Sequence, residues 1–86
     1  MSYYVTWNDD ASADVQRIYE TSTDPEGVAH TVLRIGLELS ENPCEAGESR
    51  EPGVRILFKY PLVVWFHIQE RFQDVLVFRV KPMRDR

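Results

Sequence analysis

The sequence predicts a single α+β domain in the order β-α-α-β-β-β, with two N-terminal helices packed on an antiparallel sheet. Two patterns along the 86 residues carry this prediction. Apolar residues recur at helical spacing between about residues 11 and 39, and apolar positions alternate with a period of two after Gly53. A chain of this length supports one hydrophobic core, so residues 1–86 are expected to form one domain.

The first elements are a short strand and a helix. Residues 3–7 form a β-branched and aromatic run, and Asn8-Asp9-Asp10 after it is a helix-start signal. From about Ser12 the apolar residues fall on one helical stripe, and Asp9 or Asp10 is the expected cap. The stripe consists of Ala11, Val15, Ile18 and Tyr19.

A second helix begins at Asp24-Pro25, because an acidic N-cap followed by proline at the first helical position favours a helix start. Its apolar stripe is Val28, Val32, Ile35 and Leu39, widened by Leu33 and Leu37. Asn42-Pro43 ends it. The segment 41–53 holds two Pro, two Gly and four Glu, so it is expected to be an exposed loop.

Three strands are expected at about residues 54–59, 62–69 and 75–81, joined by short connections that favour an antiparallel meander. All even-numbered positions in these strands are apolar, and this face is expected to pack on the helices. They are Val54, Ile56, Phe58, Leu62, Val64, Phe66, Ile68, Leu76, Phe78 and Val80.

The odd-numbered face combines an apolar centre with a basic margin. The centre includes Leu57, Val63, Trp65, Val75 and Val77, and the margin includes Arg55, Lys59, Arg79, Lys81 and His67. An exposed apolar patch predicts a partner-binding surface, here centred on Trp65 with Val63, Val75 and Val77. Basic side chains beside an aromatic also suit single-stranded nucleic acid, with Arg50, Lys59, Arg79 and Lys81 as candidates. The alternative is that these cations serve only solubility.

Charge is divided unevenly along the chain. Residues 1–51 carry eleven acids and three bases, net −8, whereas residues 52–86 carry seven bases and three acids, net +4. This asymmetry indicates either a basic binding surface on an acidic body or two halves that neutralise each other.

No apolar run approaches the roughly 18 residues of a membrane span, and no secretory signal is visible, so a cytoplasmic location without membrane contact is expected. The single Cys44 has no disulfide partner and is interpreted as a loop thiol. His67 is a lone histidine with a structural or a proton-transfer role. No metal site and no cofactor are expected, because no ligand cluster or phosphate-binding loop is present.

Several stretches together resemble the RelE/ParE toxins of type II toxin–antitoxin systems. They are a first strand ending in Trp7, the helical opening Ala11-Ser12-Ala13-Asp14, the Asn42-Pro43 helix end, the run Gly47-Glu48-Ser49-Arg50-Glu51-Pro52-Gly53-Val54-Arg55-Ile56-Leu57, and the basic ending Arg84-Asp85-Arg86. The resemblance covers nearly all of the chain, as a single RelE/ParE-like domain.

The resemblance implies a toxin that is neutralised by a cognate antitoxin and acts by ribosome-dependent mRNA cleavage or by inhibition of DNA gyrase. It also implies that Arg55 and Arg84 would serve an endoribonuclease, with His67 as a further candidate. The expected partners are the antitoxin and either the ribosome with mRNA or gyrase, and a homodimer would bury the same patch.

The sequence departs from the ribonuclease members of the family at several sites. Val63 stands where those members place an arginine in the penultimate strand, Leu57 stands where a second lysine is usual, and no Tyr or His follows Phe72. Cations stabilise the charge that develops on a scissile phosphate, so their loss should weaken cleavage. A catalytically degenerate binding module on the same scaffold is therefore the alternative to an active toxin.

Overall fold

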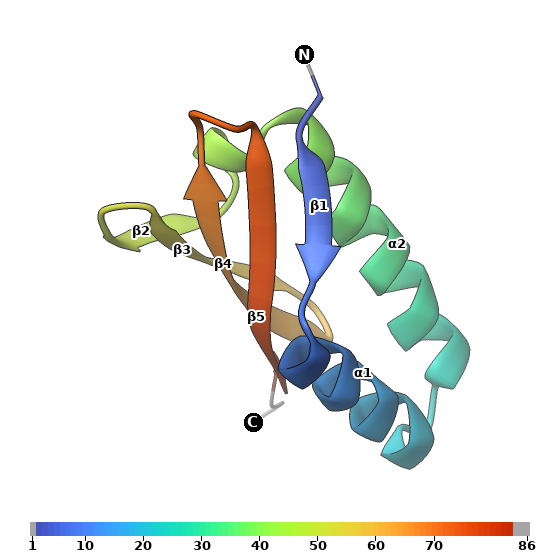
Figure 1. Cartoon of the computed structure of the whole chain (residues 1–86). Coiled ribbons are helices and arrows are strands. Elements are labelled where there is room, and N and C mark those ends of the chain that lie inside the picture. The colour runs from blue at the N-terminus through green and yellow to red at the C-terminus, as the bar shows by residue number, and fades with distance from the viewer. Residues whose placement is uncertain (1, 84–86) are drawn as a thin grey trace.

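The computed structural model describes residues 2–83. The elements are β1 (Tyr4–Trp7), α1 (Asp9–Thr21), α2 (Pro25–Glu41), the short 3-10 helix η1 (Pro43–Glu45), β2 (Glu48–Glu51), β3 (Val54–Lys59), β4 (Leu62–Gln69) and β5 (Asp74–Pro82). Figure 1 shows α1 and α2 on one side of a single twisted sheet. In this part of the chain, neither helix has the length and apolar character needed to cross a membrane.

Side-chain caps position both helices. The Asn8 side chain accepts a hydrogen bond of 2.8 Å from the amide of Ala11, so the predicted cap at Asp9 or Asp10 is wrong by one or two residues. Both aspartates lie instead in the first turn, where they interact favourably with the helix dipole. Asp24 caps α2 through the amide of Gly27, at 3.1 Å, with Pro25 behind it, as predicted.

Within residues 2–83 the sheet has five strands in the order β1-β5-β4-β3-β2. Strand β1 runs parallel to its neighbour β5, and all other pairs are antiparallel. The predicted fold class is confirmed, and the meander of β3, β4 and β5 matches its predicted residues closely. The segment 41–53 differs from the prediction, because it contains η1 and the edge strand β2 instead of being only a loop.

The core lies between the helices and the face of the sheet that they cover. Helix residues Ala11, Val28, Ile35 and Leu39 pack there against Leu57, Leu62, Val64, Phe66, Val75, Val77 and Val80. In β4 the even-numbered residues therefore face the helices, as predicted. In β3 and in the first half of β5 the prediction is wrong, because Leu57, Val75 and Val77 face the helices instead.

A β-bulge explains the change of face in β5. Trp65 pairs with Arg79 and the next residue, Phe66, pairs with Val77, so Phe78 is an extra residue in β5. Before the bulge the odd-numbered residues of β5 face the helices, and after it Val80 does. Residues that pair across two strands share a face, so Leu57 follows its partner Val64 into the core.

Candidate functional site

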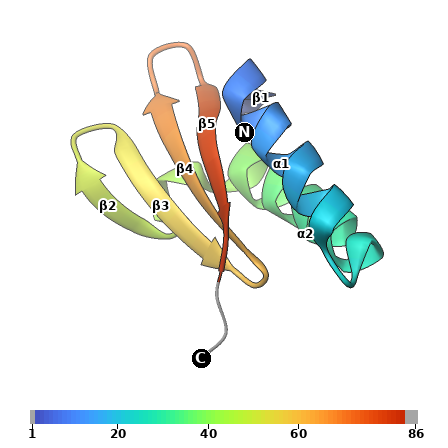
Figure 2. The same ribbon diagram turned by 90° about the horizontal axis from the view of Figure 1, so that it is seen from below.

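The face of the sheet opposite the helices is the first candidate site, and Figure 2 shows both helices on the other side. The pairing of β3, β4 and β5 places the side chains of eight residues on this face: Ile56, Phe58, Val63, Trp65, His67, Leu76, Arg79 and Lys81. We call this set the open sheet face. Phe58 is 50 % exposed and Leu76 is 38 % exposed, whereas Ile56 and Val63 are only 4 % and 8 % exposed. The exposed apolar area of this face therefore comes mainly from Phe58, Leu76 and the partly exposed Trp65.

Trp65 and Arg79 form the centre of the open sheet face. They pair directly across β4 and β5, and the Arg79 Cζ atom lies 5.8 Å from the centroid of the Trp65 ring. A guanidinium stacked over an aromatic ring keeps its hydrogen-bond donors available to a partner. Lys81 pairs with Val63, two residues along each strand from the Trp65–Arg79 pair. The predicted placement of these four residues on one face is confirmed.

The other predicted basic residues do not join this face. Arg55 pairs with the core residue Phe66 and lies on the helix side of the sheet. Lys59 also lies on that side, where its Nζ atom is 3.1 Å from Glu38 Oε1 of α2. Arg50 is exposed on the edge strand β2, and Arg84 lies outside the described residues. The catalytic candidates Arg55 and His67 are therefore on opposite faces of the sheet.

Three of the four predicted partner-binding residues are buried: Val63, which is 8 % exposed although it lies on the open sheet face, and Val75 and Val77, which face the helices. Val75 is 1 % exposed and Val77 is 0 % exposed, so neither can contact a partner in the folded chain. The bulge moves Leu76 onto the open sheet face in their place. The sequence gives no sign of the bulge, because Phe78 continues the apolar alternation without interruption.

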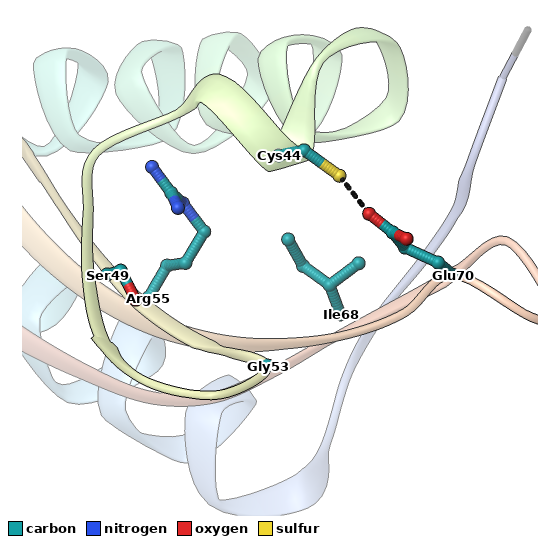
Figure 3. A pocket seen from close by; sticks show the side chains of 6 residues that line it. All are labelled: Cys44, Ser49, Gly53, Arg55, Ile68 and Glu70. Atoms are coloured by element: carbon teal, nitrogen blue, oxygen red, sulfur yellow. Dashed lines mark hydrogen bonds between the residues drawn. The ribbon is translucent and has the colours of Figure 1, made fainter.

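A second candidate site is a cleft of about 440 Å³ on the helix side of the sheet, beneath the β2–β3 hairpin. Cys44, Ser49, Gly53, Arg55, Ile68 and Glu70 line it, and we call it the hairpin cleft. Figure 3 shows Arg55 and Ser49 on one side of Ile68, and Cys44 and Glu70 on the other. The sequence interpretation missed this cleft because β2 was expected to be loop.

The Cys44 thiol donates a hydrogen bond of 2.9 Å to Glu70 Oε2, and the Tyr3 hydroxyl lies 3.7 Å from the sulfur. The hydrogen bond to the Glu70 carboxylate raises the pKa of Cys44, and the contact with Cys44 raises the pKa of Tyr3. A raised thiol pKa opposes the thiolate form that a nucleophile needs. Within residues 2–83, no group of three or more His, Cys, Asp or Glu side chains could hold a metal.

A third surface is an apolar groove of about 400 Å³ between the two helices. It is lined by Val15, Gln16, Tyr19, Ala29, Val32 and Leu33. Leu33 is 68 % exposed and nearby Leu37 is 63 % exposed. The stripe of α2 was wide enough in the sequence to indicate a second apolar face, although it was interpreted as core.

No protein-family model and no curated protein sequence matches this chain. Solved structures do. The RelBE2 toxin–antitoxin complex of Mycobacterium tuberculosis aligns with a TM-score of 0.80 at 20 % identity, covering 99 % of this chain and 95 % of the other. The chromosomal ParDE system of P. aeruginosa aligns with a TM-score of 0.71 at 22 % identity, and the alignment covers 96 % of this chain and 98 % of the other.

The isolated RelE toxin of E. coli aligns with a TM-score of 0.67 at 15 % identity, covering 99 % of this chain and 88 % of that one. These alignments run over nearly the whole of each chain, so this protein has the RelE/ParE toxin fold. The resemblance stated from the sequence is confirmed at the level of the fold.

Proposed function

We propose that this protein is the toxin component of a type II toxin–antitoxin pair and that it acts by binding its target through the open sheet face. The observation that carries the proposal is the Trp65–Arg79 stack at the centre of the sheet face that the helices do not cover. The shared fold supports it, since the structures that align include toxins in complexes with their antitoxins. Such a surface has the aromatic and arginine anchors that are typical of binding hot spots.

The choice of binding over RNA cleavage follows from the positions of the charged groups. Cleavage needs several cations around one phosphate, but Arg55 and Lys59 lie on the helix side of the sheet. Among the described residues of the open sheet face, the cations are Arg79 and Lys81, with His67 two residues along β4 from Trp65. Inhibition of DNA gyrase is accordingly favoured over ribosome-dependent mRNA cleavage.

The proposed antitoxin covers the open sheet face. Trp65 supplies a central aromatic anchor, and Arg79 and Lys81 at its side suit acidic groups in an antitoxin segment. A second copy of this chain could bury the same apolar residues, but it would bring Arg79 and Lys81 close to their own copies. Like charges at a symmetric contact are unfavourable, so a heterologous acidic partner is preferred.

The role as a toxin is tested by inducible expression in a bacterial host. We expect growth arrest with this chain alone and recovery when the product of an adjacent small reading frame is expressed with it. Trp65→Asp should abolish the arrest. Phe72→Asp is the matched control, because Phe72 is also a large exposed aromatic but lies in the β4–β5 connection. Normal growth with the unaltered, soluble chain would contradict the proposal.

Two assays with purified protein separate the targets. Loss of gyrase supercoiling activity without ribosome-dependent mRNA cleavage is the expected result. Robust cleavage that disappears in Arg79→Ala and Lys81→Ala would instead establish an endoribonuclease. Failure of both assays, together with retained binding of the adjacent gene product, would identify the degenerate binding module.

A further inference from the structure

The hairpin cleft contains a cation, Arg55, that is held in place by hydrogen bonds and forms no ion pair with any described residue. The Arg55 Nε atom donates to the Ala46 carbonyl at 2.7 Å, and Nη2 donates to the Gly47 carbonyl at 3.0 Å. Both acceptors are neutral, and no carboxylate of the described residues lies within 4.0 Å of the guanidinium. An arginine carries its charge at every relevant pH, so the partly buried Arg55 side chain, which has no counter-charge among the described residues, favours an anion.

Ser49 supplies a second donor beside Arg55. The two residues pair directly across β2 and β3, which places their side chains side by side on the cleft side of the sheet. Within residues 2–83 the Ser49 hydroxyl makes no hydrogen bond. The guanidinium is already oriented by its two carbonyl bonds, so little further entropy is lost when an oxyanion binds. A hydroxyl and a fixed guanidinium together suit a phosphate or a carboxylate.

The opposite side of the cleft has the reverse charge. Glu70 lies across Ile68 from Arg55, and its Oε2 atom accepts from Cys44. A carboxylate there favours a ligand whose other end is an ammonium group. Glu45, Glu48 and Glu51 are also exposed in η1 and β2. This surplus of acids disfavours a polyanion such as RNA, whereas a small zwitterion is not repelled.

We propose that the hairpin cleft binds a small zwitterion, with its phosphate or carboxylate on Arg55 and Ser49 and its ammonium toward Glu70. The apolar Ile68 side chain lies between the two charged ends and contacts the linking carbons. This site lies on the opposite side of the sheet from the open sheet face, so it does not depend on the proposed toxin activity.

Backbone-amide NMR of the purified chain tests the proposal with four probes. O-phosphoethanolamine and β-alanine carry both charges, and phosphate and acetate lack the amine. The zwitterions should shift the amides of Ser49, Gly53 and Ile68 and bind more tightly than the matched anions. Comparison of the affinities for O-phosphoethanolamine and β-alanine decides whether the cleft prefers a phosphate or a carboxylate. Absence of shifts from all four probes at millimolar concentration would overturn the proposal.

Variants then assign the contacts. Arg55→Gln should weaken binding about tenfold or more, since it removes a charge-assisted contact. Because that change also removes the bonds to Ala46 and Gly47, Ser49→Ala provides a second test and should weaken binding about threefold with the fold unchanged. Arg50→Gln is the matched control, because Arg50 follows Ser49 in β2 but does not line the cleft, and it should leave the affinity for the ligand unchanged. Equal affinity in all three variants would overturn the assignment.

Glu70→Gln tests the other end of the ligand. It should remove the advantage of the zwitterion over the matched anion while leaving the affinity for the anion unchanged or stronger. A short single-stranded RNA is the last probe. If RNA shifted the same amides at lower concentration than either zwitterion, the small-molecule class would be wrong and the cleft would be a nucleic-acid site.

Discussion

Neighbouring residues of β4 have opposite environments. Phe66 is 0 % exposed in the core, whereas Trp65 is half-buried on the open sheet face. Phe66→Ala should reduce the free energy of unfolding by about 3–5 kcal/mol, because it removes a fully buried ring and leaves a cavity. Trp65→Ala should cost distinctly less. Chemical denaturation measures both losses, and equal values would mean that the open sheet face is covered in solution.

The Cys44 thiol gives a pH-dependent prediction. Its pKa is raised by the hydrogen bond to Glu70, so the thiolate is scarcer at a given pH than for an ordinary cysteine. Alkylation by iodoacetamide should therefore be slow near neutral pH and should increase with a midpoint above the ordinary thiol value.

Glu70→Ala should move the alkylation midpoint to lower pH, because the variant lacks both the acceptor and the nearby negative charge. Glu45→Ala is the control. Glu45 is an exposed acid that follows Cys44 in the 3-10 helix η1, and it does not form a hydrogen bond with the thiol. An unchanged midpoint in Glu70→Ala would show that the carboxylate does not control the thiol.

At the scale of elements, the bulge in β5 decides which residues a partner can reach. Val77 faces the helices and Leu76 faces the open side, whereas the alternation in the sequence predicted that Leu76 would face the helices. Val77→Asp should unfold the protein, because a buried unpaired carboxylate costs several kcal/mol, comparable with the whole stability of a small domain. Leu76→Asp should keep the fold.

Circular dichroism and thermal melting of the two variants distinguish these outcomes. If Leu76→Asp unfolded the chain and Val77→Asp did not, the register across β4 and β5 would have to be the unbulged one. Arg79 and Lys81 would then lie on the same face as Val77.

The elements that could be predicted from the sequence are those with strong local signals. Asp24-Pro25 marked the start of α2, and the apolar alternation of β4 identified both the strand and its buried face. Strand β2 could not be predicted, since Glu48-Ser49-Arg50-Glu51 is polar, exposed and poor in strand-forming residues. It exists because its backbone pairs with β3, a tertiary contact that a local pattern does not encode.

The candidate sites were likewise predicted correctly only where the local sequence pattern decides which way a side chain faces. Trp65, Val63, Arg79 and Lys81 were placed together because β4 and the end of β5 follow the expected alternation. Arg55 was placed on the wrong side, because in β3 the polar positions face the helix layer near its margin. There Arg55 donates to the carbonyls of residues 46 and 47, and Lys59 forms an ion pair with Glu38, so each side chain has a hydrogen-bond acceptor on the helix side.

Across the whole molecule, the two layers carry opposite charge. Residues 9–41, which form the helical layer, contain eight acids and two bases, whereas the basic half of the sequence forms β3, β4 and β5. Each layer also has its own apolar surface: the groove near Leu33 on the helices, and the open sheet face near Trp65. A partner segment that suits one surface is electrostatically mismatched to the other.

Binding of the proposed antitoxin therefore tests which layer of this chain it contacts. Trp65→Asp should weaken the complex about a hundredfold or more, as expected for a central aromatic anchor. Leu33→Asp, an exposed apolar residue of the other layer, should bind as the unaltered chain does. Isothermal titration calorimetry measures both affinities. The reverse pattern would move the antitoxin to the helical groove and leave the sheet face to the target.

Strand β1 leaves the ribosome before the other described strands and pairs with β5, the last of them along the chain, through Tyr4 with Asp74 and Trp7 with Val77. At a synthesis rate of roughly 5–20 residues per second, roughly 4–14 s separate the two strands. Throughout that interval the nascent chain lacks both the partner of β1 and the guanidinium of Arg79 that stacks on Trp65. Interrupted translation would therefore release fragments without the proposed binding face, and under the proposed function fragments that lack β5 should not arrest growth.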